Sequence, residues 1–183
     1  TAVNMTKIGS PCGIAAMEAV QAAQPGAKVA GFEAKGGFLL GFTAQGPAGP
    51  LAALMTRDAF LPMLAALVAG RAAGVGLAQM VADLPARFTA SDRLTESPPG
   101  KSADFLARLG GNMAHCTDFL APLGTVAACD RTDGLRMTLT NGRIVHLRAS
   151  GNAPEFRVYT EAETATEAAV LVASSLALVR AAL

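Results

Sequence analysis

The second half of the chain carries the clearest alternation of apolar and polar residues. In LRMTLT, the apolar residues Leu135, Met137 and Leu139 alternate with polar ones, which predicts a strand with one buried face. The Asn141-Gly142 pair that follows is the strongest short hairpin signal, and it predicts a type I′ turn with positive φ at both residues. GTVAACD precedes this hairpin, and RIVHLRA and EFRVYTEA continue it. Together these segments predict a small antiparallel sheet.

Two segments of the second half have helical spacing. SADFLARLGG offers Ser102 as an N-cap and glycines as a stop signal. Further on, Thr164-x-x-Glu167 has the pattern of a capping box. The helix that follows places an apolar stripe along one side, formed by Val172, Leu176, Val179 and Leu183. Helices of this kind would cover one face of the sheet and give an α+β unit.

The first half reads as mixed α/β. TAVNMTKIG predicts a strand, and SPCGIAAMEAVQAAQ predicts a helix with Ser10 as N-cap and Pro11 at the first helical position. KVAGFE and FLLGFTA predict two short strands joined by the turn AKGG, and GPAGP predicts a loop. A helical stretch follows from Arg57 to Ala82, with glycines inside it.

A polar segment that contains three prolines, DLPARFTASDRLTESPPGK, separates the two halves. Such a change of composition is typical of a connection between domains. We therefore predict two domains, at residues 1–86 and 87–183.

The composition narrows the class of protein. Of 183 residues, 51% are hydrophobic and 16% are charged, which permits a well-buried core. The net charge of +1 and the single tyrosine argue against a nucleic-acid partner, which calls for a basic surface and aromatic stacking platforms. The cysteines are odd in number and lack CxxC spacing, so we expect buried, reduced thiols at Cys12, Cys116 and Cys129.

No segment predicts a membrane span or a signal peptide. FLPMLAALVAG reaches Arg71 after about ten residues, whereas a span needs about 20. The last apolar segment is broken by Ser174, Ser175 and Arg180, and the first ten residues lack a basic start and an apolar run. We therefore expect a cytoplasmic protein without a membrane partner. Because the sequence opens without Met, we also expect it to be a fragment of a longer protein.

The connection RASGNAPEFR has the residue types of a phosphate site. Arg148 ends one predicted strand and Arg157 lies in the next, and each guanidinium offers planar N–H donors that match a phosphate. Ser150 and Asn152 add a hydroxyl and an amide. Gly151 has no Cβ, so backbone N–H groups could approach an anion closely, as in a nest.

A few charge-assisted hydrogen bonds, at about 1.5–3 kcal/mol each, would hold a phosphate monoester in this loop. The alternative is an ordinary turn whose arginines pair with Glu155 or Glu161. The loop by itself leaves both interpretations open.

The same loop resembles R-x-S-G-T-x-P-x-x-R, the phosphate-binding loop in the C-terminal domain of the α-D-phosphohexomutases. The longer segment CDRTDGLRMTLTNGRIVHLRASGNAPEFRVYTEAET resembles the sheet of that domain. Upstream, KIGSPCGIAAM and AGFEAKGGFLLG resemble two loops of the family's third domain, and TRDAFLPMLAAL and LPARFTASDRL extend the likeness over nearly the whole chain. Among members of the family, the chain resembles bacterial phosphomannomutases most.

The resemblance implies a fold in two parts. Residues 1–86 would be the C-terminal part of the mixed α/β third domain, which binds the sugar. Residues 87–183 would be the fourth domain, a four-stranded antiparallel sheet with helices, similar to the TATA-binding protein. An incomplete third domain would leave a sheet edge unpaired, and such an edge invites pairing with another chain, so we predict a homo-oligomer or a swapped dimer.

The resemblance also implies an activity. Enzymes of this family interconvert hexose 6-phosphate and hexose 1-phosphate, such as mannose or glucose phosphates. They use a phosphoserine, a hexose 1,6-bisphosphate intermediate and Mg²⁺. The phosphate that is not transferred would be bound by Arg148, Ser150, Gly151 and Asn152, with Arg157 as support. Asn152 stands where the family usually has Thr, and its amide can still donate to a phosphate.

For the sugar ring, Glu33 matches the family's glutamate, which accepts hydrogen bonds from ring hydroxyls. The family often has G-E-x-S-G-H in this loop, whereas here Lys35 stands at the serine and Gly37 at the histidine. Without the resemblance, Glu33 and Lys35 would be charges on a solvated turn. The sugar-binding residues that the resemblance implies are Glu33, Lys35, Gly36, Lys7 and Ser10.

The family's catalytic motifs are absent from this sequence. TASD, at residues 89–92, lacks the His-Asn-Pro that follows the active-site serine, so we predict Ser91 to be an N-cap or loop residue. DRTDG has too few oxygen ligands for Mg²⁺ and predicts a turn between strands. His115 and His146 lack metal-ligand spacing, and we expect His146 to be structural.

The nucleophile and the Mg²⁺ site would therefore lie in N-terminal domains of the same protein, and this chain alone would be inert. A stand-alone phosphosugar-binding module without catalysis is the alternative. The flanking gene sequence would distinguish the two.

Overall fold

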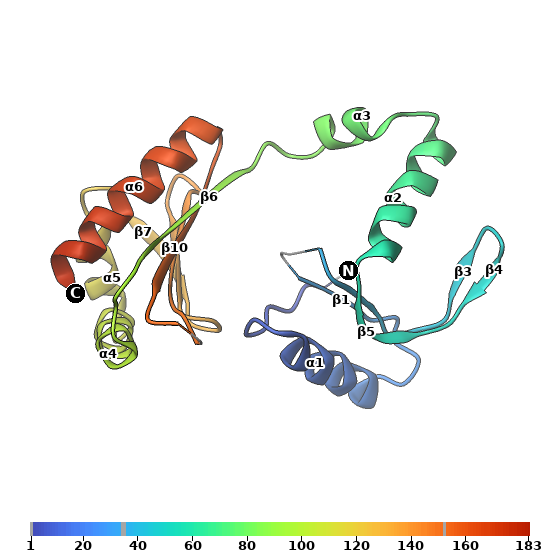
Figure 1. The fold of residues 1–183 in the computed structure, drawn as a ribbon, viewed down its shortest axis with the longest axis horizontal. Helices are drawn as coiled ribbons and strands as arrows, with labels where there is room; N and C mark the ends of the chain where they lie inside the picture. Colours follow the sequence, from blue (N-terminus) through green and yellow to red (C-terminus); the bar gives the residue numbers. More distant parts are fainter. Residues whose placement is uncertain (1, 34–35, 152) are drawn as a thin grey trace. The chain divides into compact units, whose positions relative to one another are not determined.

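The computed structural model describes residues 2–33, 36–151 and 153–183, and the chain divides into two compact units, Thr1–Pro85 and Ala86–Leu183 (Figure 1). The fold is α+β, as predicted, with antiparallel sheets in both units. The assignment of the first unit to a third domain of the family stays a prediction.

The first unit contains a three-stranded sheet, a separate hairpin and three helices. The sheet has the order β1-β2-β5, from β1 (Ala30–Phe32), β2 (Phe38–Leu40) and β5 (Leu54–Asp58), and the hairpin pairs β3 (Ala44–Gly46) with β4 (Gly49–Leu51). The helices are α1 (Ser10–Ala23), α2 (Phe60–Ala73) and α3 (Leu77–Ala82). Met17 of α1 packs against β1 and β2, where Leu39 and Leu40 are buried. This is a small core, because α2 leaves large apolar side chains exposed, such as Phe60 and Leu64.

Several predictions for the first unit need correction. Residues 2–8 form no strand, because no described strand lies beside them to complete a ladder. Arg57 belongs to β5 rather than to a helix, and α2 begins at Phe60, where the Asp58 carboxylate accepts a hydrogen bond from the backbone N–H. The segment around GPAGP, predicted as a loop, contributes to the β3–β4 hairpin.

The predicted cap of α1 is also wrong in detail. Helix α1 begins at Ser10 itself, Gly9 is the N-cap residue, and no side chain caps the first turn. The Ser10 hydroxyl donates instead to Oε1 of Glu33 at 2.7 Å, a residue 23 positions away. The serine therefore serves a tertiary contact rather than its own helix.

The second unit is a five-stranded antiparallel sheet backed by three helices. The strand order is β6-β10-β9-β8-β7. The strands are β6 (Phe88–Leu94), β7 (Val126–Asp130), β8 (Leu135–Leu139), β9 (Ile144–Ala149) and β10 (Phe156–Ala162). The helices are α4 (Pro99–Leu109), α5 (Met113–Leu120) and α6 (Ala165–Ala182). Four of these strands were predicted, and β6 makes the sheet five-stranded rather than four-stranded.

Strand β6 comes from the polar segment that the sequence indicated as a connection. It pairs with β10 along seven residues, from Phe156 opposite Leu94 to Ala162 opposite Phe88. Ser91, predicted as a loop or N-cap residue, lies in this strand opposite Tyr159. An edge strand with mostly exposed side chains shows little alternation, which is why its sequence did not reveal it.

The core of the second unit lies between the sheet and its helices, which lie on the same side of the strands (Figure 1). The predicted alternation in β8 is confirmed, because Leu135, Met137 and Leu139 are all buried. In β10, Phe156 is also buried, and its ring makes an edge contact with that of Phe105 of α4, with 5.7 Å between the ring centroids. Among the described residues, no helix of this unit packs on the other face of the sheet, where the alternate side chains of the strands are mostly polar.

Helix α6 packs as predicted. The Thr164 side chain accepts a hydrogen bond from the backbone N–H of Glu167, so the N-cap is confirmed. Of the predicted stripe, Val172, Leu176 and Val179 are buried and Leu183 is partly buried. By length and composition α6 is the one described helix that could cross a membrane, which is weak evidence because a core helix passes the same test. Its buried side faces the sheet, as in a core helix. The cellular location stays a prediction.

Two helices of the second unit differ from the sequence prediction. Helix α4 begins at Pro99, because proline fits the first helical turn, and Ser102 lies inside the helix with its hydroxyl 2.8 Å from that of Ser97. Helix α5 was not predicted; Asn112 caps it by accepting from the N–H of His115.

The β8–β9 hairpin is confirmed, but its turn is not type I′. Gly142 has φ 83°, whereas Glu96 is the only non-glycine among the described residues with a positive φ, so Asn141 does not adopt one. Leu139 bonds through its O to Gly142 N and through its N to Arg143 O, both at 2.8 Å. This is a type I turn followed by a left-handed glycine bulge, the usual three-residue hairpin.

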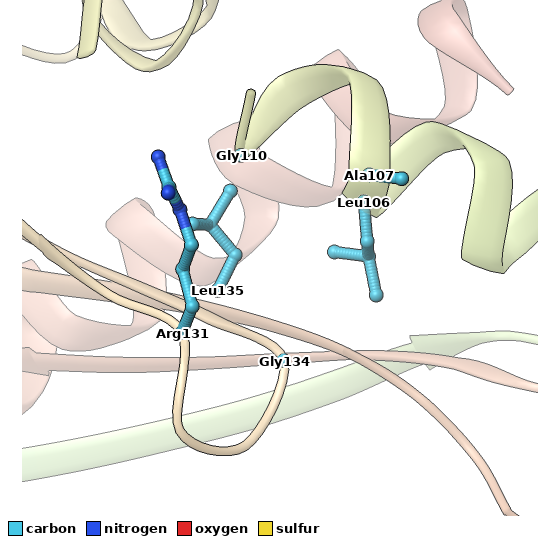
Figure 2. A pocket seen from close by; sticks show the side chains of 6 residues that line it. All are labelled: Leu106, Ala107, Gly110, Arg131, Gly134 and Leu135. Carbon is cyan, nitrogen blue, oxygen red and sulfur yellow. The ribbon is translucent and has the colours of Figure 1, made fainter. Parts of the chain in front are cut away.

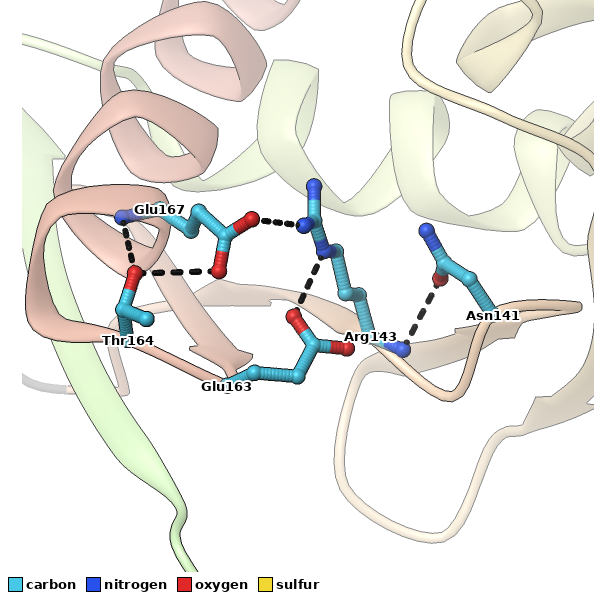
Figure 3. A network of polar contacts seen from close by, with 5 residues as sticks. All are labelled: Asn141, Arg143, Glu163, Thr164 and Glu167. Atoms are coloured by element: carbon cyan, nitrogen blue, oxygen red, sulfur yellow. Dashed lines mark hydrogen bonds and ion pairs between the residues drawn. The ribbon is translucent and has the colours of Figure 1, made fainter.

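Arg143, just after this turn, ties the hairpin to the start of α6 (Figure 3). Its Nε donates to Glu163 at 2.9 Å and its Nη2 donates to Glu167, which Thr164 also contacts. Hydrogen bonding within Glu163 itself and from Arg143 lowers the pKa of Glu163. The network fixes the hairpin end of the sheet against the first turn of the helix.

Candidate functional site

A row of three arginines crosses the helix-free face of the second unit. Arg157 of β10 lies directly opposite Arg148 of β9 on one side and opposite Arg93 of β6 on the other. Residues directly opposite in an antiparallel pair point to the same face, and like charges there repel each other. The sheet therefore concentrates three guanidinium groups beside the connection RASGNAPEFR; we call them the arginine row.

Two carboxylates partly neutralise the arginine row. Glu155 lies between two of its members, with Oε1 at 3.4 Å from Arg93 and Oε2 at 3.1 Å from Arg157. Asp133 of the β7–β8 turn pairs with Nε of Arg148 at 3.2 Å. Hydrogen bonding to Glu155 raises the pKa of Arg157, which keeps that side chain cationic. Three cations against two anions leave a positive charge at the row.

The arginines of the row differ in their ion pairs. A guanidinium has five N–H donors, and among the described residues Arg148 has one ion pair, formed through Nε to Asp133. The alternative of an ordinary turn, in which the arginines pair with nearby glutamates, is correct for Arg157, which pairs with Glu155. Arg148 pairs with neither Glu155 nor Glu161. The side chain of Arg148 is 14% exposed, which places it in a less solvated setting than Arg93 at 59%.

Backbone hydrogen bonds hold the connection between the two arginines. The N–H of Ser150 donates to Glu155 O at 2.9 Å, and the N–H of Ser97 donates to Pro154 O at 2.9 Å. Ser97 is itself fixed through its buried contact with Ser102 of α4. Ser150 is buried, and Gly151 is exposed with open space where a Cβ would lie.

Two predictions about this connection can be stated only in part. Asn152 lies outside the described residues. Gly151 is not among the glycines with positive φ, so this residue does not itself supply the left-handed half of a nest. The roles predicted for Arg148, Ser150, Gly151, Asn152 and Arg157 stay predictions.

In the first unit, Glu33 lies at the centre of a second polar cluster. Its Oε1 accepts the hydrogen bond from Ser10 at 2.7 Å, and its Oε2 lies 3.2 Å from Nη1 of Arg57. The backbone of the loop is tight, with Glu33 N bonded to Gly37 O at 2.8 Å and Gly36 N bonded to Glu33 O at 2.9 Å. Gly36 has φ 84°, a left-handed conformation that favours glycine.

The structure thus brings together two of the predicted sugar-binding residues, Glu33 and Ser10, with Gly36 in the same loop. Lys35 lies outside the described residues. Lys7 is exposed, in the segment that precedes α1. All five assignments stay predictions.

A cavity of about 250 Å³ lies between the end of α4 and the β7–β8 turn (Figure 2). Arg131 rises from the turn toward Gly110, and the wall is otherwise formed by Leu106, Ala107, Gly134 and Leu135. Arg131 is the one charged residue of this wall. A mostly apolar wall with a single cation does not match a polyol, so we place no sugar there.

The described residues do not fit Mg²⁺. No group of three His, Cys, Asp or Glu among them could hold a metal ion. In DRTDG, Asp130 accepts from the backbone N–H of Thr132 at 2.7 Å and Asp133 pairs with Arg148, so both carboxylates are engaged in holding the turn. His146 contacts the backbone O of Asp133, as expected for a structural residue.

The cysteines are free thiols, as predicted. Cys116 is fully buried and donates to Leu109 O at 3.3 Å. Desolvation, followed by the contact with Cys116, raises the pKa of Cys129 to about 12. Cys12 and Cys129 are half-buried rather than buried.

Sequence reasoning missed Arg93, Asp133 and Arg57 as neighbours of the two candidate sites. Arg93 joins the arginine row only through the pairing of β6 with β10, more than 60 positions away. Arg57 reaches Glu33 through the pairing of β2 with β5. No spacing within a single segment indicates either contact.

Residues 78–177 match the family model described as phosphoglucomutase/phosphomannomutase, C-terminal domain. The chain belongs to this family.

Two curated relatives are named phosphomannomutase. The one from Sinorhizobium fredii (strain NBRC 101917 / NGR234) is 42% identical over 173 residues, and the one from Salmonella muenchen is 41% identical over 178 residues. These matches cover 94% and 95% of this chain and 36% of each relative. The chain therefore spans about a third of the length of the relatives it matches.

Proposed function

We propose that this chain is the phosphosugar-binding part of a phosphomannomutase-like enzyme that interconverts hexose 6-phosphate and hexose 1-phosphate through a phosphoserine and a hexose 1,6-bisphosphate. In this proposal the second unit binds the phosphate that is not transferred, and the first unit binds the sugar ring. The nucleophile and the Mg²⁺ ligands belong to other domains of the enzyme, and no step of the reaction is assigned to residues of this chain.

The observation that carries the proposal is the arginine row beside the R-x-S-G connection. Among the described residues Arg148 has one ion pair, through Nε, Arg157 is held by Glu155, and Arg93 adds a third guanidinium at the same level of the sheet. A phosphate monoester carries up to two negative charges, which complement the excess positive charge of the row. Charge-assisted hydrogen bonds from arginine to phosphate are stronger and more directional than neutral ones.

The support for the sugar site is the position of Glu33. Its side chain is 17% exposed, and its carboxylate is oriented by a hydroxyl on one oxygen and a guanidinium on the other. Each carboxylate oxygen can accept more than one hydrogen bond, so the contacts with Ser10 and Arg57 are compatible with a hydrogen bond from a ring hydroxyl. The names of the two relatives support mannose phosphate as the first ligand to test.

The experiment is a calorimetric titration of the chain with mannose 1-phosphate. Arg148→Ala removes charge-assisted hydrogen bonds of about 1.5–3 kcal/mol and is expected to weaken binding by at least tenfold. Arg180→Ala is the matched control, since Arg180 is an exposed arginine of α6 and the two variants have the same net charge.

Equal affinities of the wild type and Arg148→Ala would reject the phosphate site. Circular dichroism of each variant shows whether the fold is retained. A lysine at position 148 keeps the charge but loses the planar donors, so Arg148→Lys is expected to recover only part of the affinity.

A further inference from the structure

The glutamate loop of the first unit contains a second feature that the proposed sugar site does not explain. Gly37 has a negative φ, so its backbone does not require glycine. A Cβ placed on it would lie 2.3 Å from Cγ and 2.4 Å from Cδ of Arg57. The absence of a side chain at position 37 therefore leaves the volume through which the Arg57 side chain passes.

The passage of Arg57 over Gly37 has an electrostatic consequence. It brings Nη1 of Arg57 to 3.2 Å from Oε2 of Glu33, while Ser10 occupies Oε1. The pairing of Phe38 with Asp58 between β2 and β5 places the two backbones side by side, so the contact is built into the sheet. The Arg57 side chain is 57% exposed, so solvent reaches it beside the ion pair.

A guanidinium beside a carboxylate has a specific complement. One hydroxyl of a vicinal diol can donate to the carboxylate while the neighbouring hydroxyl accepts from the guanidinium. The two oxygens of the diol have a spacing similar to that of the guanidinium nitrogen and the carboxylate oxygen. A lone carboxylate accepts hydrogen bonds but cannot donate one. The Arg57–Glu33 pair supplies both.

We propose that Arg57 is a specificity-determining residue of the sugar site. It donates to one hydroxyl of a vicinal diol on the sugar ring while Glu33 accepts from its neighbour, and Gly37 is the residue that admits Arg57 to this position. This inference rests on the proposed function, because it assigns the ring of the same phosphosugar to Glu33.

The test is an NMR titration of the full chain with mannose 1-phosphate, in which backbone amides report on each site separately. The amide of Gly36 reports on the ring site and that of Gly151 on the phosphate connection. In the wild type both signals are expected to shift. In Arg57→Ala the Gly36 response is expected to need about tenfold more ligand, or to vanish, while inorganic phosphate still shifts the Gly151 signal unchanged.

Gly37→Ala tests the steric part of the inference without removing the arginine. The added methyl displaces Arg57, so the same loss at Gly36 is expected, and the double variant Gly37→Ala/Arg57→Ala is expected to lose nothing further. Arg71→Ala, which removes an exposed arginine of α2, is the matched control and is expected to bind as the wild type does.

The outcomes separate the inference from the proposed function. A Gly36 response that persists in Arg57→Ala, or a double variant weaker than either single one, overturns the role of Arg57 and Gly37 and leaves Glu33 as a sugar ligand. A wild type in which Gly151 responds and Gly36 does not removes the sugar site and the inference with it. A wild type in which neither amide responds removes the proposed function as a whole.

Discussion

We expect an added methyl group at Gly134, in the β7–β8 turn, to lower the stability of the second unit more than the same change at Gly142. It has φ 81°, and a Cβ there would lie 2.4 Å from the backbone O of Leu147 and 3.2 Å from Cα of Arg148. Gly142 has nearly the same φ, 83°, but a Cβ there would meet only the end of the Arg87 side chain at 3.5 Å. Comparing alanine substitutions at these two glycines therefore separates the cost of backbone strain from the cost of steric overlap.

The two substitutions differ in expected magnitude. A left-handed conformation costs an L-residue about 1–2 kcal/mol, and the stiffer unfolded chain of an alanine variant returns about 0.4–1 kcal/mol. Gly142→Ala should therefore lower the free energy of unfolding by about 1 kcal/mol. Gly134→Ala adds an overlap with a backbone carbonyl, for which overpacking costs of about 1–3 kcal/mol are typical, so its loss should be about 3 kcal/mol.

The assay is urea unfolding followed by tyrosine fluorescence. Tyr159 is the only tyrosine and the chain has no tryptophan, so the emission reports on the second unit alone. With a urea dependence of about 1–3 kcal/mol per M, the midpoint of Gly134→Ala should lie about 1 M below that of Gly142→Ala. Equal midpoints would refute the reasoning, because they would mean that the turn moves away from β9 at no cost.

Three further predictions concern buried and titrating groups of the second unit. Ser175→Ala should raise the free energy of unfolding by about 1 kcal/mol, since the buried hydroxyl has no partner among the described residues; a lower midpoint contradicts this. Hydrogen bonding from Thr132 lowers the pKa of Asp130 when folded, so its contribution to stability is present above the usual aspartate pKa and is lost as pH falls through the folded pKa. Asp130→Asn should flatten the loss of stability below about pH 4, and an unchanged profile argues against it. Burial raises the pKa of Cys129 to about 12, so at pH 8 iodoacetamide should modify it far more slowly in the folded chain than in urea, as followed by peptide mass spectrometry; similar rates would show an accessible thiolate.

The sequence predicted those features of the second unit that depend on residues close together in the chain. The buried face of β8, the β8–β9 hairpin and the Thr164 cap of α6 were all readable, because side-chain alternation and capping are local properties. The likeness of RASGNAPEFR to a known phosphate loop was also a matter of one short segment. The family assignment that followed from these motifs is confirmed.

Other features were decided only by the tertiary structure. The sequence TASDRL gives no sign that it completes the sheet, and Arg93 meets Arg157 only because β6 pairs with β10 in one register. Likewise, Ser10 was expected to cap its own helix and instead donates a hydrogen bond to Glu33. Nothing in the sequence indicates that the Arg57 side chain lies where a Cβ of residue 37 would be.

The physical reason is the range of the interactions. Alternation, caps and turn glycines act over a few residues, so the sequence alone determined β7 to β10, α4 and α6 of the second unit and the polar connection between its last two strands, but not β6 or α5. Which arginines share one face, and which carboxylates partly neutralise them, depends on strand register and side-chain packing between segments more than 60 positions apart in the chain. Only the folded chain decides those pairings, and with them the charge and the hydrogen-bond donors that each candidate site presents.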